Sequence, residues 1–113
     1  MTGATLERIV KSVDGLDAVL RSTLRAGDLI YVKTHNSGYS IRALEDGLFV
    51  VSGGWFDHKG ESPATTRIRG CTWGGTAIKT DIIAARGLRI EFGNRLVTSP
   101  IEKIFVFSRG TGN

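Results

Sequence analysis

The sequence predicts a mainly β (α+β) protein, in which an N-terminal helix or helical hairpin packs on a small antiparallel β-barrel or strongly twisted sheet. Two observations predict this class. Apolar residues recur at three- and four-residue steps over residues 1–26, and short β-type segments alternate with glycine-rich turns from Asp28 onward. The 113 residues fit a single domain, divided into a helical segment at 1–26, a β-barrel at 27–108 and a tail at 109–113.

The helical segment is predicted from one apolar stripe. The stripe consists of Leu6, Ile9, Val10, Val13, Leu16, Leu20 and Leu24. Asp14 and Gly15 interrupt it, and Asp14 is suited to cap a second helix that ends at Gly27. We therefore expect one bent helix or two short ones. The run Ile104–Phe107 has no polar alternation, so we expect the sheet and this helix to cover it on both sides.

The strands are predicted from β-branched and aromatic residues between glycine-rich turns. The predicted segments are 28–34, 39–45, 48–52, 65–70, 76–83, 88–92, 95–99 and 101–108. Short strands at this spacing, with 15 glycines to turn corners, are typical of a small closed or nearly closed barrel. The interior of such a barrel is filled by side chains, so a binding site is expected on its loops or its outer face.

Residues 92–95, with Gly93 at the first central position, predict a two-residue hairpin turn of the II′ kind. This turn would place Phe92 opposite Arg95 and Ile90 opposite Val97. One face would then be buried and the other exposed. The predicted buried residues are Leu88, Ile90, Phe92 and Val97, and the predicted outward residues are Arg89, Glu91 and Thr98.

Composition argues against several functional classes. No apolar run approaches the roughly 20 residues of a membrane helix, and the N-terminus lacks the pattern of a signal peptide, so we expect a soluble, cytoplasmic protein without membrane contact. One cysteine, Cys71, and two histidines give no metal-ligand spacing. No glycine-rich nucleotide motif occurs either, and we expect neither a metal nor a cofactor.

The net charge of +4 is unevenly distributed along the chain. Residues 1–61 sum to −1, with seven basic and eight acidic residues, whereas residues 62–113 sum to +5, with eight basic and three acidic residues. The basic half is compatible with a face for an acidic partner, including nucleic acid, but solvated strand faces are the simpler explanation because no run of consecutive Lys and Arg occurs.

Four short patterns look familiar together. They are "THNSGYSI" from Thr34, "VVSGGWF" from Val50, "GCTWGGTAIK" from Gly70 and "VTSPIEKI" from Val97. Over about residues 27–107 the chain resembles a loose group of small uncharacterised bacterial β domains with T-x-N-S-x-Y, G-S-T-x-G-G and T-S-P-V patterns. This chain has Cys71 where the group has serine. The resemblance implies a shared β fold and no particular activity.

In two of these patterns a strand runs into Thr, then Ser, and then a turn former. Ser and Asn side chains at such positions bond to their own turn backbone, which explains them structurally. A ligand loop is the alternative, with Asn36 and Ser37 offering donors and acceptors near Tyr39.

The main candidate site is the loop Gly53–Gly60, within the segment Ser52–Pro63, together with the turn Gly70–Gly75. Trp55, Phe56 and Trp73 follow or precede paired glycines, and such aromatic residues suit a platform for a sugar ring, a base or an apolar side chain. Packing in the core is the alternative for both tryptophans. Arg67 and Arg69 are expected to project from one strand face and supply charge to an acidic partner.

We therefore expect a non-enzymatic binding or interaction module, a self-associating one, that uses Trp55, Phe56, His58 and Trp73 with Arg67 and Arg69. A single-stranded nucleic-acid binder is the alternative. A small hydrolase would need His58 as a base near a nucleophile such as Cys71. Asp57 is poorly placed to orient His58, because adjacent residues point apart on extended chain.

Overall fold

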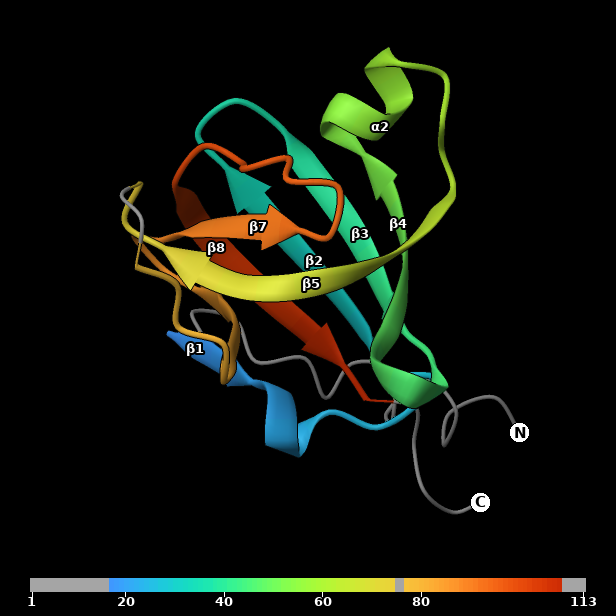
Figure 1. The fold of residues 1–113 in the computed structure, drawn as a ribbon, viewed down its shortest axis with the longest axis vertical. Helices are drawn as coiled ribbons and strands as arrows, with labels where there is room; N and C mark the ends of the chain where they lie inside the picture. The colour runs from blue at the N-terminus through green and yellow to red at the C-terminus, as the bar shows by residue number, and fades with distance from the viewer. Residues whose placement is uncertain (1–16, 75–76, 109–113) are drawn as a thin grey trace, which may run out of the picture.

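The computed structural model of this chain describes residues 17–74 and 77–108. Its strands form a six-stranded antiparallel sheet in the order β7-β5-β4-β3-β2-β8 and a two-stranded sheet of β1 and β6 (Figure 1). The strands are β1 (Ala18–Leu20), β2 (Leu29–Thr34), β3 (Gly38–Ala43), β4 (Leu48–Gly53), β5 (Ala64–Thr72), β6 (Ile82–Ala85), β7 (Arg89–Phe92) and β8 (Ile101–Phe107). A short helix, α2 (Gly54–His58), and two 3-10 turns, η1 (Arg21–Thr23) and η2 (Glu45–Gly47), lie between them. The predicted mainly β class is confirmed.

Strands β2 to β5 pair in chain order as an antiparallel meander. Alternate residues of β2 and β3 are buried, as expected where one face of a sheet covers the core. Ile30 pairs with Ile41, and Ile41 pairs with Val51, so three buried aliphatic side chains lie side by side across three strands. The strands predicted at 28–34, 39–45 and 48–52 are therefore confirmed.

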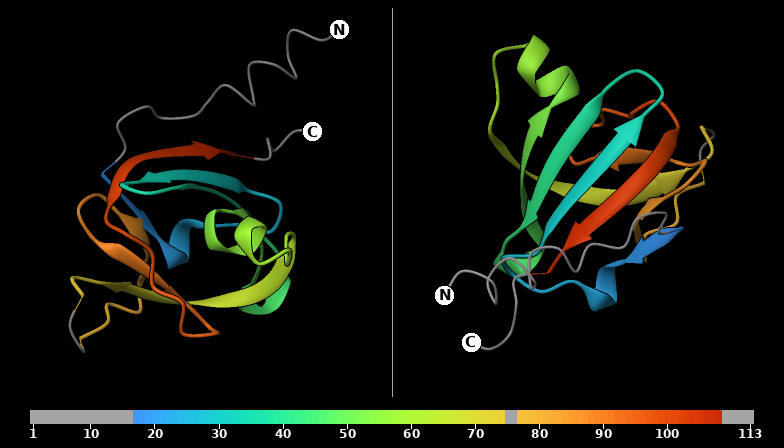
Figure 2. Two further views of the ribbon diagram at one scale, coloured as in Figure 1. Left: turned by 90° about the horizontal axis from the view of Figure 1, so that it is seen from above. Right: turned by 180° about the vertical axis from the view of Figure 1, so that it is seen from behind.

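The six-stranded sheet curls round its core but is not closed into a barrel (Figure 2). β7 and β8 are its two end strands. Two backbone hydrogen bonds link the start of β8 to the chain before β7, from Gly87 N–H to the Ile101 carbonyl and from Ile101 N–H to the Leu88 carbonyl, both 2.8 Å long. The predicted barrel is wrong, because residues 95–99 form no strand of the ladder and residues 82–85 pair with β1 instead.

The helix predicted over residues 1–26 is wrong for the part that the structure describes. Ala18–Leu20 is strand β1, whose buried Val19 pairs with Ala84 of β6. Helical spacing of apolar residues is weak evidence for a helix, and here the packing of Val19 against β6 determines the local structure instead. Residues 1–16, which hold the apolar stripe from Leu6 to Leu16, lie outside the described residues. The predicted packing of a helix from this segment on Ile104–Phe107 lies outside them as well. Within the described ranges no helix is long and apolar enough to cross a membrane.

The turn after β7 forms at the predicted residues but with another geometry. Arg95 N–H donates to the Phe92 carbonyl at 2.9 Å, and Arg95 itself has a φ of 72°. Gly93 has no positive φ, so the predicted II′ turn is wrong. Gly93 approaches β5 closely instead, since its N–H donates to the Arg67 carbonyl at 2.7 Å.

This geometry moves the register by one residue. Glu91, rather than Ile90, forms the bridge to Val97. A one-residue slip exchanges the two faces of a strand. Val97, predicted to be buried, is therefore 39 % exposed, and Thr98, predicted to point outward, is 2 % exposed. The predicted burial of Leu88, Ile90 and Phe92 is confirmed.

Candidate functional site

Three connections that are distant in the sequence meet at one end of the sheet and line an open cavity of about 320 Å³. They are the β2–β3 turn, helix α2 and the connection from β7 to β8, which lie together at the top of Figure 1. We call this cavity the turn pocket. Its lining residues are Asn36, Ser37, Tyr39, Gly54, Trp55, His58, Leu96, Val97, Thr98 and Ser99.

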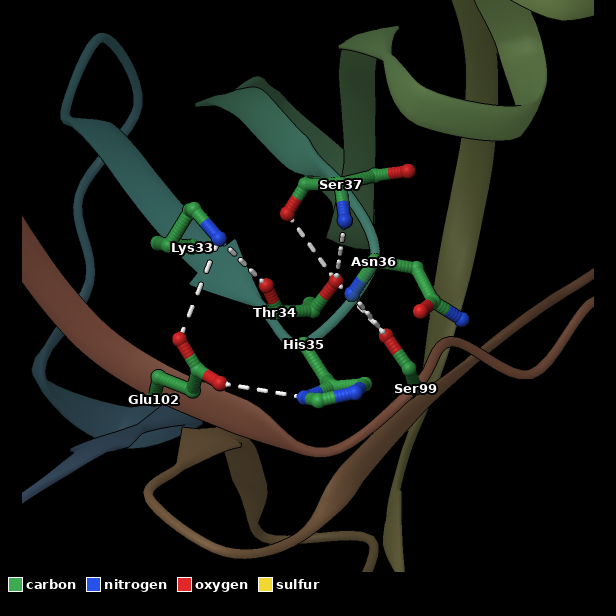
Figure 3. Close-up of polar contacts among 7 residues, drawn as sticks. All are labelled: Lys33, Thr34, His35, Asn36, Ser37, Ser99 and Glu102. Carbon is green, nitrogen blue, oxygen red and sulfur yellow. Dashed lines mark hydrogen bonds and ion pairs between the residues drawn. The ribbon is translucent and has the colours of Figure 1, made fainter.

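The buried hydroxyl of Thr34 organises the floor of the site (Figure 3). Thr34 Oγ1 donates to the Ser37 carbonyl at 2.9 Å and accepts from Ser37 N–H at 3.0 Å. It also accepts from Ser99 Oγ at 2.8 Å, while Ser99 Oγ accepts from Asn36 N–H at 2.9 Å. The side chains of the two Thr-Ser patterns thus bond to each other across the fold and fix the β2–β3 turn against the β7–β8 connection.

Thr98 fixes the second connection in the same manner. Its Oγ1 accepts from Ile90 N–H at 3.1 Å and donates to the Ser99 carbonyl at 2.8 Å. A further backbone bond, from His35 N–H to the Pro100 carbonyl at 2.9 Å, joins the two turns. The inward side chain of Thr98 therefore holds Ser99 in place at the pocket.

Charged side chains lie on the outer side of this network. Glu102 is 3.8 Å from Lys33 Nζ and 3.3 Å from His35 Nδ1, and the side chains are about half exposed for Lys33 and Glu102 and largely exposed for His35. Exposed pairs of this kind contribute little to stability. In Figure 3 the side chains of Asn36 and Ser37 point away from this cluster, and no dashed line reaches them. The charged cluster and the pocket-lining amide and hydroxyl are thus separate.

Paired glycines allow α2 to pack closely on β3. Gly53 and Gly54 have φ values of 102° and 46°, and a Cβ on Gly54 would collide with the ring of Tyr39. The Tyr39 hydroxyl accepts from Trp55 N–H at 3.3 Å. Asp57 Oδ1 accepts from Gly53 N–H at 3.1 Å. The close approach of this backbone to β3 therefore requires glycine at both positions. Asp57 bonds to the backbone just before α2 and does not orient His58.

The structure divides the aromatic residues of this segment. Trp55 is half-buried and lines the pocket beside the exposed His58, and Lys59 Nζ lies 5.9 Å from the Trp55 ring centroid. Phe56 is 1 % exposed and packs edge-on against Phe92 with 5.2 Å between ring centroids. Phe56 therefore supports the site from the core and offers no surface to a ligand.

Trp73 lies away from this pocket. It follows the last residue of β5, whereas α2 lies beside the start of that strand (Figures 1 and 2). β5 has nine residues, which span about 30 Å at the rise of a strand. Trp73 is 65 % exposed, and Lys79 Nζ lies 5.3 Å from its ring centroid. The two tryptophans therefore do not share one surface.

Arg67 and Arg69 project from β5 as predicted, and both are exposed. Each already has an acceptor within the fold. Arg67 Nη1 donates to the Asp46 carbonyl at 3.0 Å, and Arg69 Nη1 pairs with Glu91 at 2.9 Å. Because these acceptors lie on opposite sides of β5, the two guanidinium groups reach in opposite directions.

Cys71 is fully buried on β5, as expected for a lone cysteine in a strand. Burial raises the pKa of its thiol to about 12, against smaller lowering effects from a backbone hydrogen bond at Ala85 and the charge of Arg21. The reactive form of cysteine is the thiolate, so Cys71 is a poor nucleophile at neutral pH. Among residues 17–74 and 77–108, no group of three or more His, Cys, Asp and Glu lies close enough to hold a metal ion.

Comparison with protein-family models, curated proteins and solved structures finds no match for this chain. Asn36, Ser37 and Tyr39 line the pocket, as the alternative of a ligand loop predicts, whereas no sequence prediction places residues 96–99 beside them. The recurrence of Thr and Ser before both turns was the available signal, because such residues also bond between turns.

Proposed function

We propose that this protein is a non-enzymatic binding module whose turn pocket takes a small uncharged ring compound, such as a sugar, with one apolar face and a rim of hydroxyl groups. The chemistry of the lining carries this proposal. Trp55, Leu96 and Val97 offer apolar surface, whereas Asn36 and Ser37 offer hydrogen-bonding groups. None of the described residues that line the pocket is Lys, Arg, Asp or Glu.

Three polar side chains of the lining retain their hydrogen-bonding capacity. The Asn36 amide, the Ser37 hydroxyl and the His58 imidazole make no side-chain hydrogen bond to any residue in the described ranges. An amide and a hydroxyl each offer donors and acceptors, which matches the hydroxyl rim of a sugar. The indole of Trp55 gives a flat surface for the apolar face of the same ring.

The size of the pocket and its support favour a single ring. A cavity of about 320 Å³ is at the low end of the range for small-molecule sites. The Thr34, Ser99 and Asn36 hydrogen bonds hold one wall, and the buried Phe56 holds α2 from below. Preorganised walls reduce the entropic cost of binding, which compensates for a small contact area.

The two tryptophans provide a matched pair of variants for the test. Ligand-observed NMR with methyl pyranosides and nucleosides should detect binding to the wild type and to Trp73→Ala, and binding at least about tenfold weaker to Trp55→Ala. Thermal melting of both variants shows whether the fold persists. Binding that depends on Trp73 and persists in Trp55→Ala contradicts the proposal.

Single-stranded nucleic acid is a second candidate ligand, at the outer face of β5 and β7. The observation that favours it is the exposure of Arg67 and Arg69 on one strand, although Glu91 pairs with Arg69 and the exposed Asp46 lies beside Arg67. Affinity for a short oligonucleotide would then fall steeply with salt, by about 0.7 in log K per log salt for each phosphate contact. Fluorescence anisotropy across a salt series tests this, and salt-insensitive or absent binding rejects it.

We further infer self-association through β8, an end strand of the six-stranded sheet. The half-buried rings of Tyr31 and Phe105 lie together on its outer side, 6.3 Å between centroids. End strands with apolar surface favour pairing between copies. Light scattering should give a dimer mass for the wild type and a monomer mass for a folded Phe105→Asp variant. A monomeric wild type rejects this inference.

A further inference from the structure

A second cavity, of about 350 Å³, lies at the opposite end of β3 from the turn pocket. It is enclosed by the connection from β1 to β2 and by the connection from β3 to β4, at the bottom of Figure 1. We call it the arginine cavity. Its lining residues are Arg21, Leu24, Arg25, Ala26, Ala43, Leu44, Asp46, Gly47 and Phe49. Five of these nine residues are apolar, and Ala43 and Phe49 belong to the buried core.

The guanidinium group of Arg21 is fixed on one wall of this cavity and has no carboxylate partner among the described residues. Its Nε donates to the Thr80 carbonyl at 2.9 Å, and its Nη2 donates to the Ile68 carbonyl at 2.7 Å. These carbonyls hold the group in place but do not neutralise its charge, and Arg21 makes no ion pair within the described part of the chain. Nη1 makes no hydrogen bond to a residue in the described ranges, so both of its hydrogens can donate to a bound acceptor.

Further charges of both signs surround the cavity. Arg25 lines it and is exposed, without a side-chain hydrogen bond to a described residue. Arg67 Nη1 is 3.0 Å from the Asp46 carbonyl at the same edge. Two exposed carboxylates, of Asp46 and Glu45, lie on the β3–β4 connection and oppose these cations in part. The buried Asp28 carboxylate accepts from the Arg25 backbone N–H at 3.0 Å and adds a third negative charge nearby. Among the residues that line the cavity, however, two guanidinium groups stand against the single carboxylate of Asp46, which favours an anion.

We propose that the arginine cavity binds a small free carboxylic acid with an apolar body. The carboxylate accepts hydrogen bonds from Arg21 Nη1 and Arg25, and the apolar body occupies the space between Leu24, Ala43 and Phe49. Carbonyl-held guanidinium groups suit this recognition, because the planar fork of arginine matches carboxylate geometry and no side chain must be reorganised. This site is independent of the turn pocket and of its proposed ligand.

The test is a titration of the full chain with sodium octanoate below its micelle concentration, followed by amide chemical shifts. Octan-1-ol and acetate serve as probes that lack the charge or the apolar body. We expect saturable shifts with octanoate alone, confined to residues 21–28 and 43–49. Affinity should fall at least about fivefold in Arg25→Gln and be unchanged in Lys103→Gln, which removes an exposed positive charge from β8.

Two further variants separate the alternatives. Ala26→Phe fills the cavity and should abolish the octanoate shifts while the melting temperature shows that the fold persists. Equal shifts with octan-1-ol indicate apolar adsorption, and equal shifts with acetate indicate anion binding without an apolar site. Either result overturns the proposal, as does unchanged octanoate affinity in both Arg25→Gln and Ala26→Phe, or shifts outside the two segments.

Discussion

Replacement of Thr34 by valine tests the hydrogen-bond network that fixes the turn pocket. Thr34 is fully buried, and its Oγ1 takes part in three hydrogen bonds, two with Ser37 and one with Ser99. Valine has nearly the same shape, so Thr34→Val removes these bonds without opening a cavity. The change therefore isolates the contribution of the hydroxyl group.

The expected loss of stability follows from these three bonds. Each typically contributes about 0.5–1.5 kcal/mol net, and a buried group left without a partner costs more. Ser37 and Ser99 are only half-buried, so water replaces part of what they lose. We expect Thr34→Val to lower the free energy of unfolding by about 2–3 kcal/mol, or the melting temperature by roughly 10 °C for a chain of this length.

Urea denaturation measures this change, with Thr65→Val as the matched control. Thr65 is exposed on β5, and its side chain makes no hydrogen bond to another residue that the structure describes. The same chemical substitution there should change the free energy of unfolding by less than about 0.5 kcal/mol. If the two variants unfold within about 0.5 kcal/mol of each other, Thr34 does not organise this end of the sheet.

Two other predictions concern stability and reactivity. Gly53→Ala should lower the free energy of unfolding by at least about 3 kcal/mol, because Gly53 has a φ of 102° and an added Cβ would collide with the Gly38 carbonyl. Gly60→Ala is the control: Gly60 has a φ of 71° and open space around it, so the loss should be about 1 kcal/mol. Equal unfolding midpoints of the two variants in urea would refute the close approach at Gly53. Cys71 should react with iodoacetamide at pH 8 at least about a hundredfold more slowly in the folded chain than in urea, and a comparable rate would refute its burial. Since folding raises the pKa of this thiol from 9.0 to about 12, the stability it contributes is complete below pH 9 and lost as the pH rises towards 12. The free energy of unfolding should therefore fall between pH 9 and pH 12, and it should fall less steeply in Cys71→Ala than in the wild type. Identical pH dependence in the two proteins would contradict the raised pKa of Cys71.

The β class and the early strands could be predicted from the sequence because their signals are local. Alternating burial fixes the face of each residue in β2 and β3, and the turn glycines mark where those strands end. The segment Ala18–Leu20 could not be predicted, because its strand exists only through pairing with residues 82–85. Helical spacing within that segment says nothing of a partner more than sixty residues away.

The candidate site was predictable only in part, for similar reasons. Paired glycines selected Trp55, which lines the pocket but is half-buried against the core, and the same rule selected Phe56, which points into the core. The rule also selected Trp73, which lies beyond the far end of β5. Val97 and Thr98 exchanged faces because Arg95 adopts a positive φ, a backbone choice that the sequence of the turn does not determine.

The most direct test of the turn pocket is an NMR titration of the full chain with a methyl pyranoside, followed through its tryptophan indole signals. The chain has two tryptophans, so two Nε1–H resonances are expected, and the Trp55→Ala and Trp73→Ala variants assign them. Our account predicts saturable movement of the Trp55 signal, together with the amides of Asn36 and Ser37, while the Trp73 signal stays fixed. Movement of the Trp73 signal alone, or of neither signal across the pyranosides and nucleosides, would contradict it.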